Sequence, residues 1–194
     1  MPHLSPTTLT ADEQRLILRA TAGNIRDHTI ISLALGTGLR LAEIVGLDVG
    51  DVFAPDGTPR VRVRVRAVIA KGGRAADVFL PDRLVAKLRR FWRSKRDRGE
   101  SLAPDAPLFC NQSGRRISKR RVQFAWATWQ QRAGFDRVYP FHCTRHTAVT
   151  NVYRATHDLF LAQRFARHVS PLTTVVYTHP SDQEMAGRVR GLPC

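Results

Sequence analysis

Four side chains in the last third of the sequence could together transfer a phosphoryl group. His142 and Arg145 stand three residues apart in a helix-compatible stretch, so both can project from one helical face toward a shared target. His168 follows, and Tyr177 lies nine residues beyond it. A guanidinium can bind two phosphate oxygens at once through two parallel hydrogen bonds. An imidazole can take up and release protons near neutral pH, and a tyrosine oxygen can hold a phosphoryl group covalently. The pattern favours phosphoryl transfer to a phenol oxygen, which requires no metal ion or other cofactor.

The first forty residues predict helices that would lie behind such a site. Thr10, followed three residues later by Glu13, is typical of a capping box that begins a helix. Asn24 or Asp27 could cap a second helix. Gly36 and Gly38 are expected to end that second helix, since glycine readily adopts the backbone conformation of a helix stop.

A third helix is predicted to begin near Leu39, which places Arg40 at a helix start. Glu43 lies one turn further on, where it could hold a catalytic arginine or histidine in place. On the local sequence alone, Arg40 is an ordinary surface arginine and Glu43 its ion-pair partner.

A basic hairpin is predicted between residues 60 and 80. The run RVRVRVR alternates strictly, which indicates a strand over 60–66 with valines on one face and Arg62, Arg64 and Arg66 on the other. The run KGGR, with Lys71 and Arg74 around two glycines, predicts the turn, and 75–80 returns as the partner strand. Lys71 is therefore expected at a hairpin tip, where the local sequence also fits a solvated turn lysine.

The second half of the chain adds further basic helices. Residues from Pro81 onward carry apolar side chains at helical spacing with arginines and lysines around them. Ser118 is expected to cap a later helix. Cations at its start, where the helix dipole disfavours them, indicate an external anion. If the anion is a nucleic acid, these cations and those of the hairpin would contact it, namely Arg62, Arg64, Arg66, Arg74, Arg115, Arg116, Lys119, Arg120 and Arg121.

The composition indicates a globular, polyanion-binding protein. The chain has 194 residues, a hydrophobic fraction of 43% and a formal net charge of +15, which fits a single domain that seeks nucleic acid. Only four of its 31 basic residues are lysines, so most of the charge is on the side chain that binds phosphate through paired hydrogen bonds. A GC-rich genome could produce the same ratio of arginine to lysine, but it does not account for the net charge.

Several other classes of protein are disfavoured. Three cysteines without Cys-x-x-Cys spacing indicate neither a disulfide framework nor a zinc site, which fits a reducing cytoplasm. No basic-apolar leader and no apolar run of bilayer length is present. We therefore expect a cytoplasmic, nucleoid-associated protein without membrane contact.

Taken together, these motifs resemble the catalytic domain of the tyrosine recombinases, the phage integrase family. The family carries an early arginine, a hairpin lysine, a His-x-x-Arg pair, a His or Trp, and the nucleophilic tyrosine. Candidates occur here in that order over residues 9–179: Arg40 in GTGLRLAEIVGLDVGDV, Lys71 in IAKGGRAADVFLP, His142 with Arg145, His168 and Tyr177. Two departures stand out. Arg167 replaces the usual glycine before His168, and Cys143 and Thr144 fill the pair's inner positions, the second of which is usually leucine.

The resemblance implies an α+β fold that is mainly α-helical, with a small antiparallel hairpin at one edge. It implies a site-specific recombinase or integrase acting through a covalent 3′-phosphotyrosine on Tyr177. Arg40 and Arg145 would bind the non-bridging oxygens, His142 would exchange a proton with Tyr177, and His168 would donate to the phosphate. Lys71 would protonate the departing 5′-oxygen.

The resemblance also implies double-stranded DNA as partner and a homo-oligomer on it, a tetramer in the synapse. We expect one catalytic domain over 1–194, without the family's N-terminal helical domain. Ser181 would begin a tail helix over 181–194, with Met185, Val189 and Leu192 on one face. Two other functions stay open: relaxation of supercoils by a type IB topoisomerase, which needs one protomer, and DNA binding by a regulator without turnover.

Overall fold

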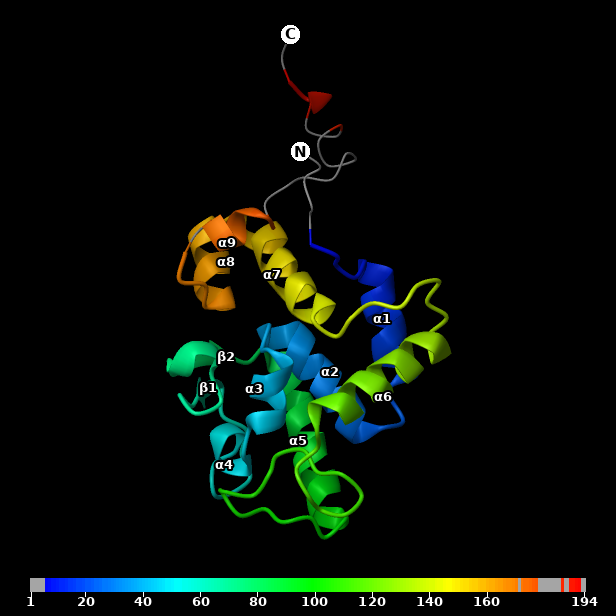
Figure 1. The fold of residues 1–194 in the computed structure, drawn as a ribbon, viewed down its shortest axis with the longest axis vertical. Coiled ribbons are helices and arrows are strands. Elements are labelled where there is room, and N and C mark those ends of the chain that lie inside the picture. The colour runs from blue at the N-terminus through cyan, green and yellow to red at the C-terminus, as the bar shows by residue number, and fades with distance from the viewer. Residues whose placement is uncertain (1–5, 171, 178–185, 187–188, 193–194) are drawn as a thin grey trace.

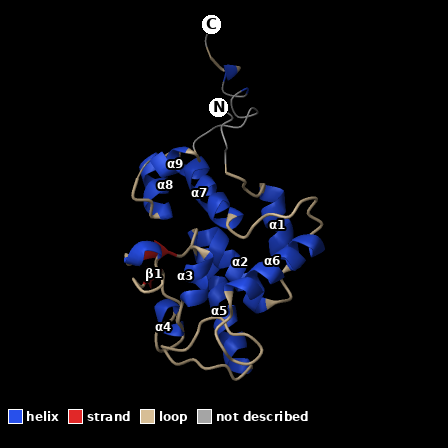
Figure 2. Cartoon of the chain, viewed as in Figure 1, coloured by secondary structure: helices blue, strands red, loops and turns tan. Residues whose placement is uncertain are grey.

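The chain folds into a set of helices with one small hairpin at the edge of the molecule (Figure 1). The structure is a computed structural model that describes residues 6–170, 172–177, 186 and 189–192. In chain order its elements are α1 (Ala11–Ala20), α2 (Ile25–Thr37), α3 (Leu41–Gly46), α4 (Val49–Val52), β1 (Arg62–Val65), the 3₁₀ turn η1 (Lys71–Gly73), β2 (Ala76–Phe79), α5 (Asp82–Asp97), α6 (Lys119–Arg132), α7 (Cys143–Thr156), α8 (Leu159–Ala166) and α9 (Leu172–Val175). The described part is thus mainly helical with one two-stranded antiparallel sheet, as predicted (Figure 2).

The helix starts follow the capping residues of the sequence. Thr10 and Glu13 form the predicted capping box of α1. Asn24, and not Asp27, caps α2, because its side chain accepts a hydrogen bond from the Asp27 backbone N–H. Ser118 caps α6 through the backbone N–H of Arg121.

The predicted stop of α2 is right at one glycine and wrong at the other. Gly38 ends the helix in the left-handed conformation, at φ 62°. Gly36 lies inside the helix, where an added Cβ would approach Leu84 to 3.3 Å, so its missing side chain lets α2 lie close against α5. Arg40 then lies directly before the first residue of α3, at a helix start as expected.

The hairpin is shorter than predicted, and a loop over 66–75 joins its strands, with the KGGR run forming only the 3₁₀ turn η1 inside that loop. β1 spans 62–65 and pairs with β2 in the register Val63 with Val78 and Val65 with Ala76. Val63 and Val65 are buried, whereas Val61 lies before the strand and is exposed. Gly72 and Gly73 both have positive φ, which lets the chain reverse at Lys71.

The apolar core has two parts. The main cluster contains residues from the helices α1 through α6 and from the hairpin. A smaller cluster, built from Val149, Ala162, Ala166 and Tyr177, holds α8 and α9 on α7. Figure 1 shows α7, α8 and α9 grouped together beside α2, while the hairpin and α3 lie next to the end of α8. One group of elements is thus α1 to α6 with the hairpin, and the other is α7 to α9. The predicted catalytic residues lie where these two groups meet.

The predicted tail helix over 181–194 lies mostly outside the described residues. Val189 and Leu192 are described, and both are exposed.

Candidate active site

Arg40 and Glu43 form a fixed pair at the start of α3. The Arg40 backbone N–H donates to Glu43 Oε2 over 2.8 Å, and its Nη1 donates to Oε1 over 3.2 Å. Glu43 is 1% exposed. Burial alone would raise the pKa of Glu43, but the guanidiniums of Arg167 and Arg40 and the Arg40 backbone N–H lower it overall. The carboxylate therefore stays charged and orients Arg40.

Arg145 lies at the junction between the two groups of elements. Its side chain extends from the first turn of α7 and is 2% exposed. Nη1 donates to the Gly38 carbonyl over 2.5 Å, and Nη2 donates to the Ala166 carbonyl. Burial, and then the charges of Arg40 and Arg167, lowers the pKa of Arg145 to about 10, so it remains a cation at neutral pH. Since a guanidinium has five N–H donors, three are left for a phosphate.

Tyr177 is buried against two histidines. It is 7% exposed and belongs to the smaller core cluster. Its phenol oxygen lies 2.6 Å from His146 Nδ1, and its ring is nearly parallel to that of His168, at 6.2 Å between centroids. Burial raises the pKa of Tyr177, against the lowering effect of Arg145 and Arg40. The side chain is therefore a neutral phenol at neutral pH.

His146 is absent from the residue set predicted from the sequence. It lies four residues after His142, and this i, i+4 spacing was the available signal that the two share a helical face. Their rings meet edge to face at 4.6 Å. The direct partner of the tyrosine is thus His146, whereas proton exchange was predicted for His142.

The three histidines of the site are all shifted toward the neutral form. Burial, followed by neighbouring cations, lowers the pKa of His146 to about 4 and that of His168 to about 4. The exposed His142 also has a lowered pKa, because its ring loses hydration and then because Arg145, Arg40 and Lys71 repel a proton. With its proton on Nε2, neutral His146 can accept the phenol hydrogen at Nδ1. His168 Nδ1 lies 3.0 Å from the Thr174 hydroxyl, which leaves Nε2 for another partner.

These shifts predict that acid destabilises the fold. His146 and His168 would titrate near 6.5 when unfolded and near 4 when folded, so the unfolded chain binds more protons in between. Their full contribution is present above pH 6.5 and is lost as pH falls toward 4. We expect a loss on the order of 1 kcal/mol per histidine between about pH 7 and about pH 5, measured by urea unfolding. His146→Asn should lose less on acidification, and the exposed His157→Asn should behave as wild type. Equal acid losses in all three proteins would contradict the predicted burial of a neutral His146.

Lys71 lies at the hairpin tip and is exposed. Its charge contributes, after burial and the charges of Arg145 and Arg40, to the lowered pKa of His142. The role of Lys71 as general acid stays a prediction.

The predicted DNA-binding cations divide into two groups. Arg66 donates to Asp51 and to the Gly46 carbonyl and pairs with Asp48. Arg116 donates to Asp48 and to the carbonyls of Val45 and Leu47. These two guanidiniums hold the segments after α3 in place, and a DNA contact by either stays a prediction. Arg62 is exposed but paired with Asp77, and the remaining predicted cations are exposed: Arg64, Arg74, Arg115, Lys119, Arg120 and Arg121.

Neither a metal site nor a membrane span occurs among the described residues. They contain no group of three or more His, Cys, Asp or Glu side chains placed to bind a metal ion. Among them, no helix combines the length and the apolar character needed to cross a membrane.

Known proteins share both the sequence pattern and the fold. The model of the phage integrase family matches residues 7–184. The tyrosine recombinase XerC of Vibrio cholerae is 30% identical over 93% of this chain and 56% of its own length, and that of Haemophilus ducreyi is 34% identical over 84% and 50%. This chain therefore spans about half the length of these relatives.

Solved structures agree with the sequence comparison. A crystal structure of XerA recombinase has a TM-score of 0.81 at 24% identity, over 97% of this chain and 66% of that one, which shows the fold. A structure of the XerH site-specific recombinase bound to its difH substrate has a TM-score of 0.75 at 25% identity, over 95% and 54%. The family model matches residues 7–184 of the 194 in this chain, and the site holds a tyrosine among arginines and histidines. The chain therefore belongs to the phage integrase family.

Proposed function

We propose that this chain is the catalytic part of a site-specific DNA recombinase that breaks and rejoins strands through a 3′-phosphotyrosine. The observation that best supports the proposal is the 2.6 Å contact of the Tyr177 phenol with His146, close enough to Arg145 for its charge to act on the pKa of the phenol. A buried phenol hydrogen-bonded to a neutral imidazole is a nucleophile paired with its base.

The bonds made and broken balance without an external energy source. The Tyr177 oxygen attacks phosphorus, and its proton passes to His146. The bond from phosphorus to the 5′-oxygen breaks, and that oxygen takes a proton from Lys71. Attack of a 5′-hydroxyl on the phosphotyrosine reverses these steps and joins the strands. Because one phosphate ester replaces another, the bond energy is conserved in the protein–DNA linkage.

The site must offset the cost of ionising the phenol. A pKa of 10 costs roughly 4 kcal/mol at pH 7, and burial of Tyr177 adds to that cost. Transfer of the proton to His146 during attack avoids a free phenolate. Arg40 and Arg145 would meet the charge that develops on the non-bridging oxygens, and His168 would donate to the same phosphate through Nε2.

Double-stranded DNA is the proposed partner, with four copies of the protein in the complex that exchanges strands. The net charge of +15 and the exposed cations of the hairpin and α6 support a phosphate-binding surface. The XerH structure named above holds its DNA substrate. A protein that acts on the chromosome in this way would work at the nucleoid in the cytoplasm.

Covalent trapping tests the proposed function. Rounds of binding from a pool of randomised duplexes would first supply a site, and a nick would then be placed beside the cleaved phosphate so that the short strand diffuses away. We expect a protein–DNA adduct in a denaturing gel, and recombinant products from two intact sites. Adduct formation with relaxation of supercoiled plasmid, but no recombinants, would favour the topoisomerase. Binding without any adduct would favour the regulator and contradict the proposal.

Lys71 as general acid makes a separate prediction. A 5′-alkoxide leaves poorly without a proton, whereas a thiolate leaves readily because its conjugate acid has a much lower pKa. We expect Lys71→Ala to cleave about 100-fold more slowly than wild type, and to recover nearly fully when sulfur replaces the bridging 5′-oxygen. Arg74→Ala, which removes an exposed cation three residues away, should behave alike on both substrates. If Lys71→Ala is equally slow on oxygen and sulfur, Lys71 positions DNA and does not supply the proton.

A further inference from the structure

Arg167 has a backbone conformation that usually belongs to glycine. It ends α8 at φ 56° and ψ 42°, directly before His168. A residue with a Cβ is strained in this region, and such strain persists where the surroundings hold the residue in place. Keeping a long side chain at this position therefore indicates that the side chain has a use.

The Arg167 side chain contacts Glu43, the carboxylate that orients Arg40. Its Nη2 donates to Glu43 Oε2 over 2.7 Å, across 124 residues of sequence. The two side chains are 11% and 2% exposed. Its buried Nε has no hydrogen-bond partner among the described residues. One buried carboxylate thus serves two arginines, Arg40 and Arg167.

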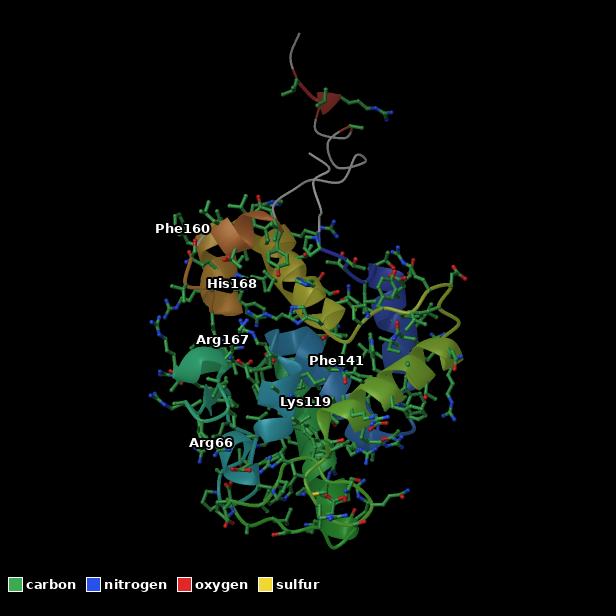
Figure 3. All side chains as sticks on the ribbon, in the orientation of Figure 1. Arg66, Lys119, Phe141, Phe160, Arg167 and His168 are labelled. Carbon is green, nitrogen blue, oxygen red and sulfur yellow. The ribbon has the colours of Figure 1, made fainter. Side chains whose placement is uncertain are left out.

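This contact connects the two halves of the site. His168 and Tyr177 follow α8, and Tyr177 belongs to the smaller core cluster, whereas Arg40 lies between Leu39 and Leu41, which pack in the main one. Arg167 extends from the end of α8 that faces α3 and the hairpin (Figure 3). Its ion pair with Glu43 therefore joins the segment that carries the nucleophile to the helix that carries Arg40.

We propose that Arg167 is a positioning residue, which through Glu43 holds Arg40 in register with His168 and Tyr177. The inference rests on the proposed function. Without Arg167, Glu43 would interact with Arg40 only, and the end of α8 would no longer be joined to α3 by an ion pair. A displacement of about 1 Å in a group that meets the transition state can cost about 100-fold in rate, so a small shift of Arg40 would be measurable.

Arg167→Gly is a favourable test variant because glycine accepts the same backbone conformation without strain. On the nicked substrate at saturating DNA, we expect its cleavage rate to fall by about 10- to 100-fold with little change in DNA affinity. Arg167→Lys, which keeps the charge, should recover part of the rate. Arg164→Ala removes an exposed arginine from the same helix and should cleave like wild type. A wild-type rate in Arg167→Gly would overturn the inference.

A substrate with an uncharged phosphate analogue distinguishes two roles of Arg167: positioning Arg40, or supporting the fold in general. A methylphosphonate replaces one non-bridging oxygen by methyl, so less charge develops and a well-placed Arg40 matters less. We expect the deficits of Arg167→Gly and of Arg40→Ala, each relative to wild type, to shrink on this substrate. An unchanged deficit in Arg167→Gly would assign the residue to the fold and overturn the inference.

Two controls keep the outcomes distinct. Thermal unfolding of each variant shows whether it is folded at the assay temperature, and if Arg167→Gly is not, Arg167→Lys carries the same comparison. If wild type itself forms no adduct, the proposed function fails, and the role of Arg167 fails with it. If wild type forms the adduct and Arg167→Gly matches it, only the role of Arg167 fails.

Discussion

Tyr177→Phe is expected to form no covalent adduct with DNA while binding the nicked substrate as tightly as wild type. The substitution removes only the phenol oxygen, and the ring can still pack against His168 and the smaller core cluster. His146 Nδ1 loses its partner, which should cost roughly 1 kcal/mol of folding stability. A denaturing gel measures the adduct, and a native gel or anisotropy titration measures the affinity.

Tyr139→Phe provides the matched control. Tyr139 is also a buried tyrosine whose hydroxyl is hydrogen-bonded, donating to Glu13 over 2.6 Å, but it lies in the main core cluster. Its variant should lose a comparable amount of stability and still form the adduct. An adduct that survives in Tyr177→Phe would show that another group is the nucleophile.

Arg145→Ala should lose both catalysis and stability. Its charge would meet the developing negative charge of the phosphate, so we expect cleavage to fall by about 10²- to 10³-fold. The Gly38 and Ala166 carbonyls would also lose their buried donor, at a cost of about 2 kcal/mol or more in the free energy of unfolding. Single-turnover cleavage at saturating DNA and urea unfolding measure the two effects.

Arg115→Ala removes the same charge from an exposed loop and separates binding from chemistry. It should weaken DNA binding modestly and leave single-turnover cleavage at saturating DNA near the wild-type rate. Arg145→Ala should show the opposite pattern. If Arg145→Ala cleaves at the wild-type rate once DNA is saturating, the guanidinium serves the fold and does not act on the phosphate.

The features that local sequence could predict are those that depend on neighbouring residues. The capping box at Thr10, the cap at Asn24, the left-handed stop at Gly38 and the hairpin turn before Arg74 all involve contacts within a few residues. Helical spacing likewise predicted that His142 and Arg145 lie at the same end of one helix, and α7 begins there. Tyr177 and Arg40 came from the resemblance to the tyrosine recombinases, and their catalytic roles stay predictions.

The tertiary structure alone decided which histidine contacts Tyr177 and which cations are free. His142 and His146 share a helical face, and the packing of α8 and α9 on α7 seats the phenol on the second of them. Arg66 and Arg116 look as available in sequence as Arg64, yet carboxylates 15 and 68 residues away bind them. Arg167 finds Glu43 across 124 residues. Composition and order set the inventory of charged groups, but each pairing depends on distances that exist only once the helices have packed, because electrostatic attraction is strong only at short range and away from water.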